Sequence, residues 1–269
     1  IRVELGAQIG QGAFGKVFIG ANIDTGELMA VKQVPGGIEG PQQKKSSDSL
    51  EREIAFLSQL NHDNIVRYIG MRIPNFFILG FDSVDGNFNV YLEYVSGGTV
   101  ASGIAQYGKF DETITRSFTA QILCGLEYLH DRDIIHRDIK GANVLVTSEG
   151  VAKISDFGIS KKNEYAAYHR MTRLSFQGTV PWMAPEVARG KGYSAKVDIW
   201  SCGCLVLEML SGKLPWHNVR GQVIYLLGTG NAPPIPPSIA DAPREFISTT
   251  FEIDPEKRPT ASDLLDHPF

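Results

Sequence analysis

Hydrophobic and polar residues follow two different patterns along this chain. In the first third, short apolar runs at residues 17–19 and 28–34 lie on either side of a polar, glycine-containing turn at residues 24–26. Apolar runs joined by such a turn are typical of a β-hairpin. We therefore predict two paired strands near the start of the chain.

A helix is predicted after these strands, because apolar residues at positions 50, 54, 57 and 60 recur at helical spacing. Residues 46–49 contain serines and an aspartate that can cap it. The run at residues 91–95 reads as a last strand, and the Ser-Gly-Gly sequence after it predicts a flexible joint. This part of the chain is predicted to form a mostly antiparallel sheet with one helix packed on it.

Helical patterns dominate beyond the joint. Residues 113–130 carry apolar side chains at positions 114, 118, 122, 126 and 129, at helical spacing. Residues 199–210 are almost all apolar, which predicts a buried helix. The proline-rich residues 232–237 read as a connection between helices.

These patterns predict a single α+β domain with two lobes. A small antiparallel β lobe with one main helix spans residues 1–92, a hinge spans 93–97, and a larger α-rich lobe spans 98–269. The 269 residues are 43% hydrophobic and 21% charged, which is ordinary for a soluble globular protein. The net charge of -4 gives no basic field, so protein or small-molecule substrates are favoured and nucleic acid is not a predicted partner.

The three cysteines favour a reducing compartment. Cys124, Cys202 and Cys204 lie in apolar stretches without a Cys-x-x-Cys pair, so neither a disulfide framework nor a zinc site is predicted. The most apolar stretch, residues 197–210, is interrupted by polar residues and is too short to span a bilayer. We predict a cytoplasmic protein without a membrane partner. The chain begins at Ile1 without a signal-peptide pattern, and we interpret it as a domain excised from a longer protein.

Three glycines near the start form a candidate phosphate-binding loop. Gly10, Gly12 and Gly15 have the spacing G-x-G-x-x-G and precede Val17. Glycine lets backbone N–H groups approach phosphate oxygens without a Cβ in the way. A dinucleotide-binding fold shares this spacing, but its glycines lead into a helix, whereas these lead into a predicted strand. Taken alone, the motif fits either a nucleotide loop or a plain glycine-rich hairpin.

Lys32 lies inside an apolar strand, after Ala30 and Val31. An ammonium group is costly to bury unless it meets an anion, and ATP phosphates together with a carboxylate from the predicted helix would provide one. Glu53 is the preferred carboxylate because it shares a helix face with residues that should point inward, and Glu51 is a near alternative. A lysine that extends to the surface is the other interpretation.

Residues 136–143 (HRDIKGAN) contain the groups that phosphoryl transfer needs. This reaction requires a carboxylate to accept the hydroxyl proton, a cation on the γ-phosphoryl oxygens, and Mg²⁺ to neutralise developing charge. Asp138 is the candidate carboxylate, Lys140 the cation, and Asn143 a neutral oxygen ligand for the metal. Asp156, which begins Asp-Phe-Gly on a loop after a predicted strand, is a second candidate Mg²⁺ ligand.

These motifs, in this order and followed by Ala184, Pro185 and Glu186, resemble those of the eukaryotic protein kinase superfamily over essentially the whole chain. The resemblance implies the bilobal protein kinase fold, with ATP and Mg²⁺ as cofactors. The implied catalytic residues are Asp138, Lys140 and Lys32. The implied cofactor-binding residues are Ile9, Gly10, Gly12, Gly15, Val17, Ala30, Lys32, Glu53, Glu93, Val95, Asn143, Leu145 and Asp156, of which Asn143 and Asp156 bind the metal.

Two further positions resemble supporting parts of this family. Asp198 resembles the aspartate that fixes the backbone of the catalytic loop, and Arg258 resembles the arginine that pairs with Glu186. Both are expected to act on structure. A charged group buried without its partner would cost several kcal/mol.

Lys140, and Thr179 after a glycine, resemble the pattern of serine/threonine kinases. The resemblance therefore implies that the acceptor is a serine or threonine hydroxyl. Residues 178–187, together with 136–145 and 254–260, most resemble mitogen-activated protein kinase kinase kinases, in particular the fungal cell-wall-integrity branch. The resemblance implies a MAP kinase kinase as the protein substrate. It also implies upstream activators that act through regulatory regions missing from this chain.

A phosphorylation switch is predicted from Arg137, a cation beside the catalytic aspartate that a phosphate could engage. Thr172 and Ser175 are the candidate sites, because Thr179 is expected to have a structural role. Either one could also be an ordinary loop hydroxyl.

The sequence departs from the family at residues 73–81 (IPNFFILGF), where a shorter link between strands is typical. A longer hairpin, a docking element or a splicing error in the gene model would each explain it. Residues 220–227 also look short for the helix expected there. A nucleotide-binding pseudokinase or scaffold is the main rival function, although every catalytic position is filled, and an oxidoreductase would not explain Asp138, Asn143 and Asp156.

Overall fold

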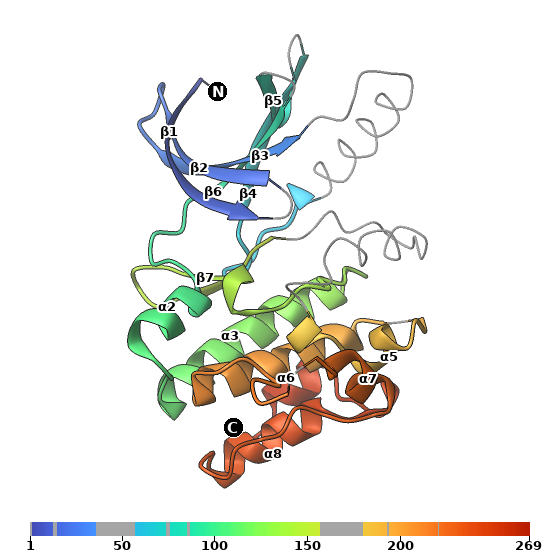
Figure 1. The fold of residues 1–269 in the computed structure, drawn as a ribbon. Helices are drawn as coiled ribbons and strands as arrows, with labels where there is room; N and C mark the ends of the chain where they lie inside the picture. Colours follow the sequence, from blue (N-terminus) through green and yellow to red (C-terminus); the bar gives the residue numbers. More distant parts are fainter. Residues whose placement is uncertain are drawn as a thin grey trace. The chain divides into compact units, whose positions relative to one another are not determined.

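The computed structural model describes residues 2–12, 15–35, 57–73, 76–84, 87–156, 180–192, 194–219 and 221–269. The chain divides into two compact units, Ile1–Ser96 and Gly97–Phe269 (Figure 1). Most of the helix predicted for residues 50–60 lies outside the described residues. Leu57 and Leu60, at its predicted end, are buried.

The first unit is built on an antiparallel six-stranded sheet in the order β1-β2-β3-β6-β4-β5, which confirms the predicted sheet. Its strands are β1 Val3–Gly12, β2 Gly15–Asn22, β3 Leu28–Pro35, β4 Tyr68–Ile73, β5 Phe76–Val84 and β6 Asn87–Glu93. The predicted hairpin is β2–β3. Its turn closes where the Gly26 N–H donates to the Asn22 carbonyl at 2.7 Å, with Gly26 at a φ of 74° that favours glycine.

The described part of the unusual residues 73–81 belongs to two paired strands, in line with the longer hairpin among the three explanations that the sequence left open. They end β4 and make up most of β5, where Ile73 pairs with Phe76 and Met71 with Gly80. β5 then continues onto β6, where Asp82 pairs with Asn89. The departure from the family pattern thus extends the sheet by backbone pairing.

The core of the first unit lies around Met29, Val31 and Tyr91, and the partly buried Val3 packs against it. Gly20 on β2 lies over this core, and a Cβ there would come within 2.7 Å of a Val31 methyl group. The absence of a side chain therefore allows close packing. β6 ends at Glu93, two residues before the predicted end of the run at 91–95.

The second unit is mainly helical (Figure 1). Its elements are α2 Val100–Tyr107, α3 Glu112–His130, η1 Gly141–Asn143, β7 Val144–Val146, β8 Ala152–Ile154, η2 Val180–Trp182, α5 Pro185–Ala188, α6 Lys196–Ser211, α7 Val223–Gly228, α8 Asp241–Thr250 and α9 Ala261–Leu265. The proline-rich residues 232–237 connect α7 with α8, as predicted. α7 is six residues long, in line with the short helix expected there.

Helix α3 confirms the predicted helix but turns a different side toward the core near its start. Ile114 was among the apolar positions of the pattern, yet it is 43% exposed, and Thr115 and Thr119 are buried instead. Each threonine hydroxyl donates to a carbonyl one turn earlier, Thr115 to Asp111 at 2.8 Å and Thr119 to Thr115 at 2.7 Å. Because the hydroxyls are satisfied within the helix, these threonines can lie in the core.

Helix α6 is buried along almost its whole length, as its apolar sequence predicted. Cys202 and Cys204 are free thiols inside it. Burial, with a smaller effect from the nearby Asp198 charge, raises the pKa of the Cys202 thiol to about 12. Both thiols are fully buried, which makes them inert by comparison with exposed cysteines of low pKa.

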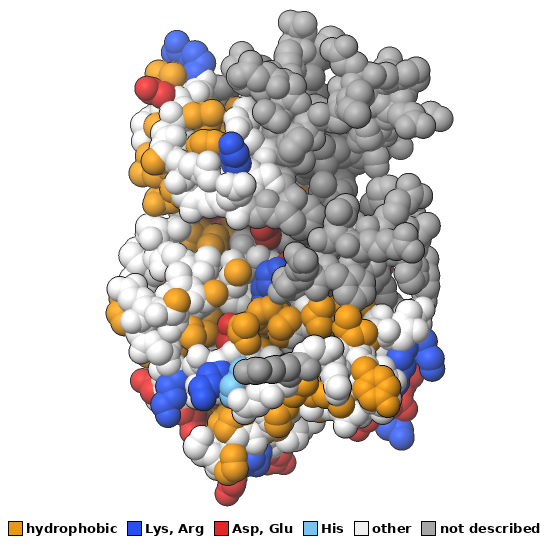
Figure 2. Space-filling view, viewed as in Figure 1, with side chains coloured by type: hydrophobic (Ala, Val, Ile, Leu, Met, Phe, Trp, Pro, Cys, Tyr) orange, Lys and Arg blue, Asp and Glu red, His pale blue; other side chains and the backbone are white. Residues whose placement is uncertain are grey.

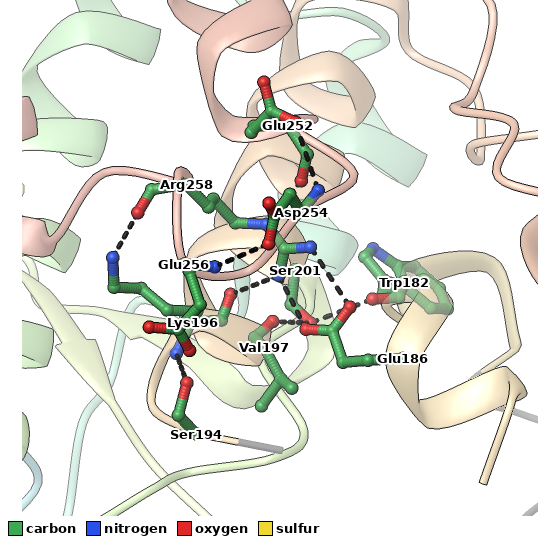
Figure 3. A network of polar contacts seen from close by, with 10 residues as sticks. All are labelled: Trp182, Glu186, Ser194, Lys196, Val197, Ser201, Glu252, Asp254, Glu256 and Arg258. Atoms are coloured by element: carbon green, nitrogen blue, oxygen red, sulfur yellow. Dashed lines mark hydrogen bonds and ion pairs between the residues drawn. The ribbon is translucent and has the colours of Figure 1, made fainter. Parts of the chain in front are cut away.

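A buried ion pair joins α5 to the loop before α9, and it confirms the predicted pairing (Figure 3). The Arg258 guanidinium donates to both carboxylate oxygens of Glu186, at 2.8 and 3.1 Å. It also donates to the carbonyls of Lys196 and Glu252, at 2.8 and 2.9 Å, and lies 5.1 Å from the Trp200 ring centroid. The cation is therefore compensated by charge, hydrogen bonds and an aromatic face.

The surface mixes charged with apolar side chains (Figure 2). The large apolar side chains exposed on the described part of the second unit are Tyr107, Ile114, Leu214, Ile224 and Tyr225. Within the described ranges, no helix has the length and apolar content needed to cross a bilayer.

We predict that Arg258→Ala lowers the free energy of unfolding by about 3–5 kcal/mol, because it leaves the buried Glu186 carboxylate without its cation. Thermal or urea unfolding followed by circular dichroism measures this change. The matched control is Lys257→Ala, since Lys257 is exposed and 3.9 Å from Asp254. This control should change the free energy by less than about 0.5 kcal/mol. Equal effects of the two variants would contradict the prediction.

Candidate active site

Asp198 on α6 holds the backbone of the candidate catalytic loop, residues 136–143 (called the catalytic loop below), as the sequence predicted. Its carboxylate accepts the N–H of His136 at 2.9 Å and the N–H of Arg137 at 2.7 Å. Burial acts to raise the pKa of the Asp198 carboxyl, but the hydrogen bond and charge of His130, together with smaller contributions that include the Arg137 N–H, outweigh it, so that the pKa lies below its usual range. Arg137 has a φ of 71°, a conformation that non-glycine residues rarely adopt. The two hydrogen bonds therefore fix a strained backbone.

His136 links the catalytic loop to the loop that precedes Asp156. Its Nδ1 accepts the N–H of Asp138 at 3.2 Å, and its Nε2 lies 2.9 Å from the carbonyl oxygen of Ser155. This hydrogen-bond pattern assigns the neutral tautomer with the proton on Nε2, because Nδ1 must accept while Nε2 donates. One imidazole thus sets the positions of two segments that carry candidate site residues.

Asp138, Lys140 and Asn143 are brought together in the structure. The Lys140 ammonium donates to both Asp138 carboxylate oxygens, at 3.0 and 2.7 Å. The Asn143 amide nitrogen donates to the Asp138 carboxylate at 2.8 Å and to the Asp138 carbonyl at 2.7 Å. The side chains of Asp138 and Lys140 are 24% and 20% exposed, so solvent and ligands can reach them. The carboxylate is held in one orientation by two donors.

Asn143 and Asp156 lie at the same end of the small sheet β7–β8. Asn143 comes directly before β7, Asp156 follows β8 by two residues, and the two strands are antiparallel. Ser155 also donates to the Asn143 carbonyl through its N–H at 2.8 Å and its hydroxyl at 3.0 Å. Because the Asn143 amide nitrogen faces Asp138, its oxygen is the atom left to bind a cation. A carboxamide and a carboxylate oxygen fit the hard ligands that Mg²⁺ prefers.

Metal sites built from three or more His, Cys, Asp or Glu side chains are absent from the residues that the structure describes. Mg²⁺ in nucleotide sites is typically held by one or two carboxylates plus phosphate oxygens and water. Asn143 and Asp156 are consistent with a Mg²⁺ ion that takes its remaining ligands from phosphate oxygens and water.

Gly97 and Gly98, at the start of the second unit, pack closely on β7. The Gly98 carbonyl accepts the Val146 N–H at 2.9 Å, and Thr99 bridges to Leu145. A Cβ on Gly97 would lie 2.3 Å from the Val146 carbonyl oxygen. The sequence predicted a flexible joint from these glycines, and the structure shows that Gly97 also has a steric reason to be glycine.

In the first unit, strand register places several predicted nucleotide residues on one sheet face. Val17 pairs with Lys32, Gly10 pairs with Val17, and Ala30 lies two positions from Lys32 on the same strand. Ile9 falls at a register shift in β1 and is 48% exposed. β-bulges redirect side chains in this way, often beside functional sites.

Glu93 and Val95 have roles within the first unit. A Glu93 carboxylate oxygen accepts the Arg67 N–H at 3.1 Å, and the Glu93 N–H donates to the Arg67 carbonyl at 2.9 Å. Val95 is buried. The structure therefore gives both the side chain and the backbone N–H of Glu93 partners within the protein.

Several predicted residues lie outside the described residues: Glu53, Phe157, Gly158, Thr172, Ser175 and Thr179. Conversely, sequence reasoning gave no role to His130 or Ser155, which hold Asp198 and Asn143. His130 ends a strongly periodic helix just before the catalytic loop, which is a usable signal. Nothing in the sequence around Ser155 distinguishes it from an ordinary loop serine.

Comparison with known proteins adds a family match. The pattern described as "Protein kinase domain" matches residues 3–269. The chain is 45% identical over 274 residues to the serine/threonine-protein kinase BCK1/SLK1/SSP31 of Saccharomyces cerevisiae, covering 98% of this chain and 18% of that protein. It is also 45% identical over 277 residues to the MAP kinase kinase kinase mkh1 of Schizosaccharomyces pombe, covering 98% and 24%.

A plant relative is similarly close. The chain is 44% identical over 271 residues to the mitogen-activated protein kinase kinase kinase ANP1 of Arabidopsis thaliana, covering 98% of this chain and 39% of that protein. The chain thus spans less than half the length of these three curated relatives.

We predict that Gly97→Ala destabilises the protein by about 1–3 kcal/mol, because the added Cβ would overlap the Val146 carbonyl and force the backbone to move. Chemical denaturation measures this change. Gly228→Ala is the matched control, since a Cβ at Gly228 in α7 meets nothing within 4 Å. The control should be neutral or slightly stabilising. A Gly97→Ala protein as stable as the control would contradict the steric argument.

Proposed function

The chain belongs to the protein kinase family, and on that premise we propose that it transfers the γ-phosphoryl group of ATP to serine or threonine hydroxyls of proteins. The observation that carries this proposal is the arrangement of Asp138, which a lysine and an asparagine hold in one orientation on a loop anchored to α6. Phosphoryl transfer depends mainly on positioning and charge, and this loop supplies both.

Each residue of the catalytic loop has a proposed role. Asp138 orients the acceptor hydroxyl and accepts its proton as the oxygen attacks phosphorus. Lys140, which is 2.7 Å from the Asp138 carboxylate, stabilises the negative charge on the transferred group. Asn143 fixes Asp138 through its amide nitrogen and turns its oxygen toward the cation site.

The residues that bind the nucleotide are proposed from the donor groups that each of them offers. Backbone N–H groups around Gly10, Gly12 and Gly15, together with the Lys32 ammonium, are proposed to bind its phosphates, with Glu53 as the partner of Lys32. Asn143 and Asp156 are proposed to hold Mg²⁺, which when bound neutralises charge on the phosphates. The chemistry of these donor types, oxygen for the metal and N–H or ammonium for phosphate, supports the assignment.

The physiological role is proposed from the relatives. Two of them are named as MAP kinase kinase kinases, so we propose a MAP kinase kinase as the substrate and activators that act through regions beyond this chain. We propose that phosphorylation of Thr172 or Ser175 switches the kinase activity on, with the new phosphate bound by the Arg137 guanidinium. The same proposal includes a division of the chain into a small lobe, a hinge and a large lobe at residues 1–92, 93–97 and 98–269. It also includes a cytoplasmic location and no nucleic-acid or membrane partners.

A phosphoryl-transfer assay with γ-labelled ATP, Mg²⁺ and myelin basic protein tests this function. Asp138→Asn keeps the shape of the side chain but removes its ability to accept a proton, so we predict that kcat falls by about 10²–10⁴-fold. Asp156→Ala should abolish Mg²⁺-dependent turnover while circular dichroism shows an intact fold. Asp241→Asn, at an exposed aspartate in the first turn of α8, is the matched control and should keep the activity of the parent.

A parent protein that transfers no more phosphate than Asp138→Asn would contradict the proposal and favour a nucleotide-binding pseudokinase or scaffold. Retained Mg²⁺-dependent turnover in Asp156→Ala would contradict the metal assignment alone.

A further inference from the structure

The connection between α7 and α8 is rich in prolines that the proposed chemistry does not use (Figure 1). Residues 232–237 read Ala-Pro-Pro-Ile-Pro-Pro. Each proline fixes its own φ at about −65°, and a residue that precedes a proline is pushed out of the helical region. These restrictions favour the polyproline II conformation through most of the segment. In the structure, residues 231–236 belong to no helix, strand or turn, in line with such a backbone.

Exposure along this segment repeats every three residues. Pro233 is buried and Pro236 is half-buried, whereas Pro234 and Pro237 are exposed. A polyproline II helix has three residues per turn, so residues three apart lie on the same edge. Pro233 and Pro236 therefore form the edge that faces the protein. Pro234 and Pro237 form a separate edge that faces solvent, called the proline ridge below.

The proline ridge is held in place on both sides. Before it, the Asn231 N–H and side-chain amide both donate to the Leu226 carbonyl, at 2.9 and 3.1 Å. At its other end, the Arg244 guanidinium donates to the carbonyls of Pro236 and Ile239, at 3.0 and 2.8 Å. A partner would therefore bind a segment whose backbone is already ordered, which lowers the entropic cost of association.

Opposite charges lie at the two ends of the proline ridge. Arg189 is exposed, its Nε donates to the Gly228 carbonyl at 2.9 Å, and a Cβ on Gly230 would lie 3.0 Å from its Nη2. The guanidinium is therefore fixed beside the chain that enters the ridge. Asp241, four residues after Pro237, is exposed at the start of α8. These charges give the ridge a direction, because a partner with an acidic patch would align that patch with Arg189.

Exposed prolines in this arrangement fit one mode of protein recognition. Grooves lined with aromatic side chains bind polyproline II segments of the pattern Pro-x-x-Pro. Pro234 and Pro237 have this spacing. A proline ring loses almost no side-chain entropy when it is buried, so its apolar surface contributes to binding without that cost.

We propose that the proline ridge is a docking site for an SH3-type domain, whose aromatic groove binds Pro234 and Pro237 and whose acidic patch beside the groove pairs with Arg189. The site includes none of the residues proposed for phosphoryl transfer, and the inference does not rest on that function. It gives this chain a binding surface for a protein module in addition to its proposed substrates.

Binding of the 269-residue chain to a panel of purified SH3 domains, followed by fluorescence anisotropy, tests this inference. At least one domain should bind with a Kd below about 1 mM. A synthetic poly-L-proline peptide should compete with the chain, because it occupies the same aromatic groove. A Gly-Ser peptide of equal length should not compete, since it does not form a stable polyproline II helix.

Two variants of the ridge locate the contact. Pro234→Ala and Pro237→Ala each remove a ring that the groove would bury, so each should raise the Kd for the domain so identified about tenfold. Circular dichroism should show the parent's fold, because both rings are exposed. Pro268→Ala is the matched control, since Pro268 is an exposed proline that lies after α9, outside the ridge. It should leave the Kd within about twofold of the parent.

A charge variant tests the direction of binding. Arg189→Gln removes the cation, so the Kd should rise about fivefold at low ionic strength and depend less on salt than in the parent. Lys257→Gln is the matched control, because it removes a cation that is exposed and 3.9 Å from Asp254. It should leave the Kd and its salt dependence unchanged.

The inference is overturned if no SH3 domain of the panel binds the chain, or if the domain that binds keeps the parent's Kd with Pro234→Ala and Pro237→Ala. It is also overturned if Pro268→Ala weakens binding as much as the ridge variants do. The same Kd for Arg189→Gln as for the parent at low salt would overturn the pairing with an acidic patch, and with it the SH3-type partner.

Discussion

The candidate site depends on the hydrogen bonds that the Asp198 carboxylate accepts. It is fully buried, yet it stays charged because His130 and two backbone N–H groups of the catalytic loop surround it. Those hydrogen bonds hold Arg137 in a backbone conformation that non-glycine residues rarely adopt. The orientation of Asp138, one residue further, follows from that fixed backbone. Without the carboxylate, two buried donors would lose their acceptor.

Helix α6 holds other segments of the second unit in the same way, through polar groups that are paired with them. Besides Asp198, it carries Ser201 and Glu208, which hold Trp182, and Lys196, which contributes its carbonyl and its ammonium to bonds with Arg258. Each polar group on this buried helix that takes part in the site has a partner from a different segment. A rigid apolar helix with a few paired polar groups can thus fix several loops at once.

The sequence was sufficient where a pattern is local. Periodicity located α3 and α6 and the β2–β3 hairpin, and ordered motifs located Asp138, Lys140 and Asn143. It was insufficient where a contact joins distant positions, such as Glu208 with Trp182, because spacing along the chain carries no information about such pairs. It also placed Ile114 on the wrong side of α3, since apolar periodicity ignores threonines whose hydroxyls are satisfied by their own helix.

Amide hydrogen exchange at His136 and Arg137 tests the role of Asp198 most directly. If the carboxylate holds the catalytic loop, both amides are protected from exchange in the parent. They should exchange about 10- to 100-fold faster in Asp198→Asn, because asparagine is uncharged and has only one oxygen to accept the two N–H groups. Amides in the middle of α3 should keep their protection. Exchange at the same rates in parent and variant would contradict the idea that this carboxylate fixes the site.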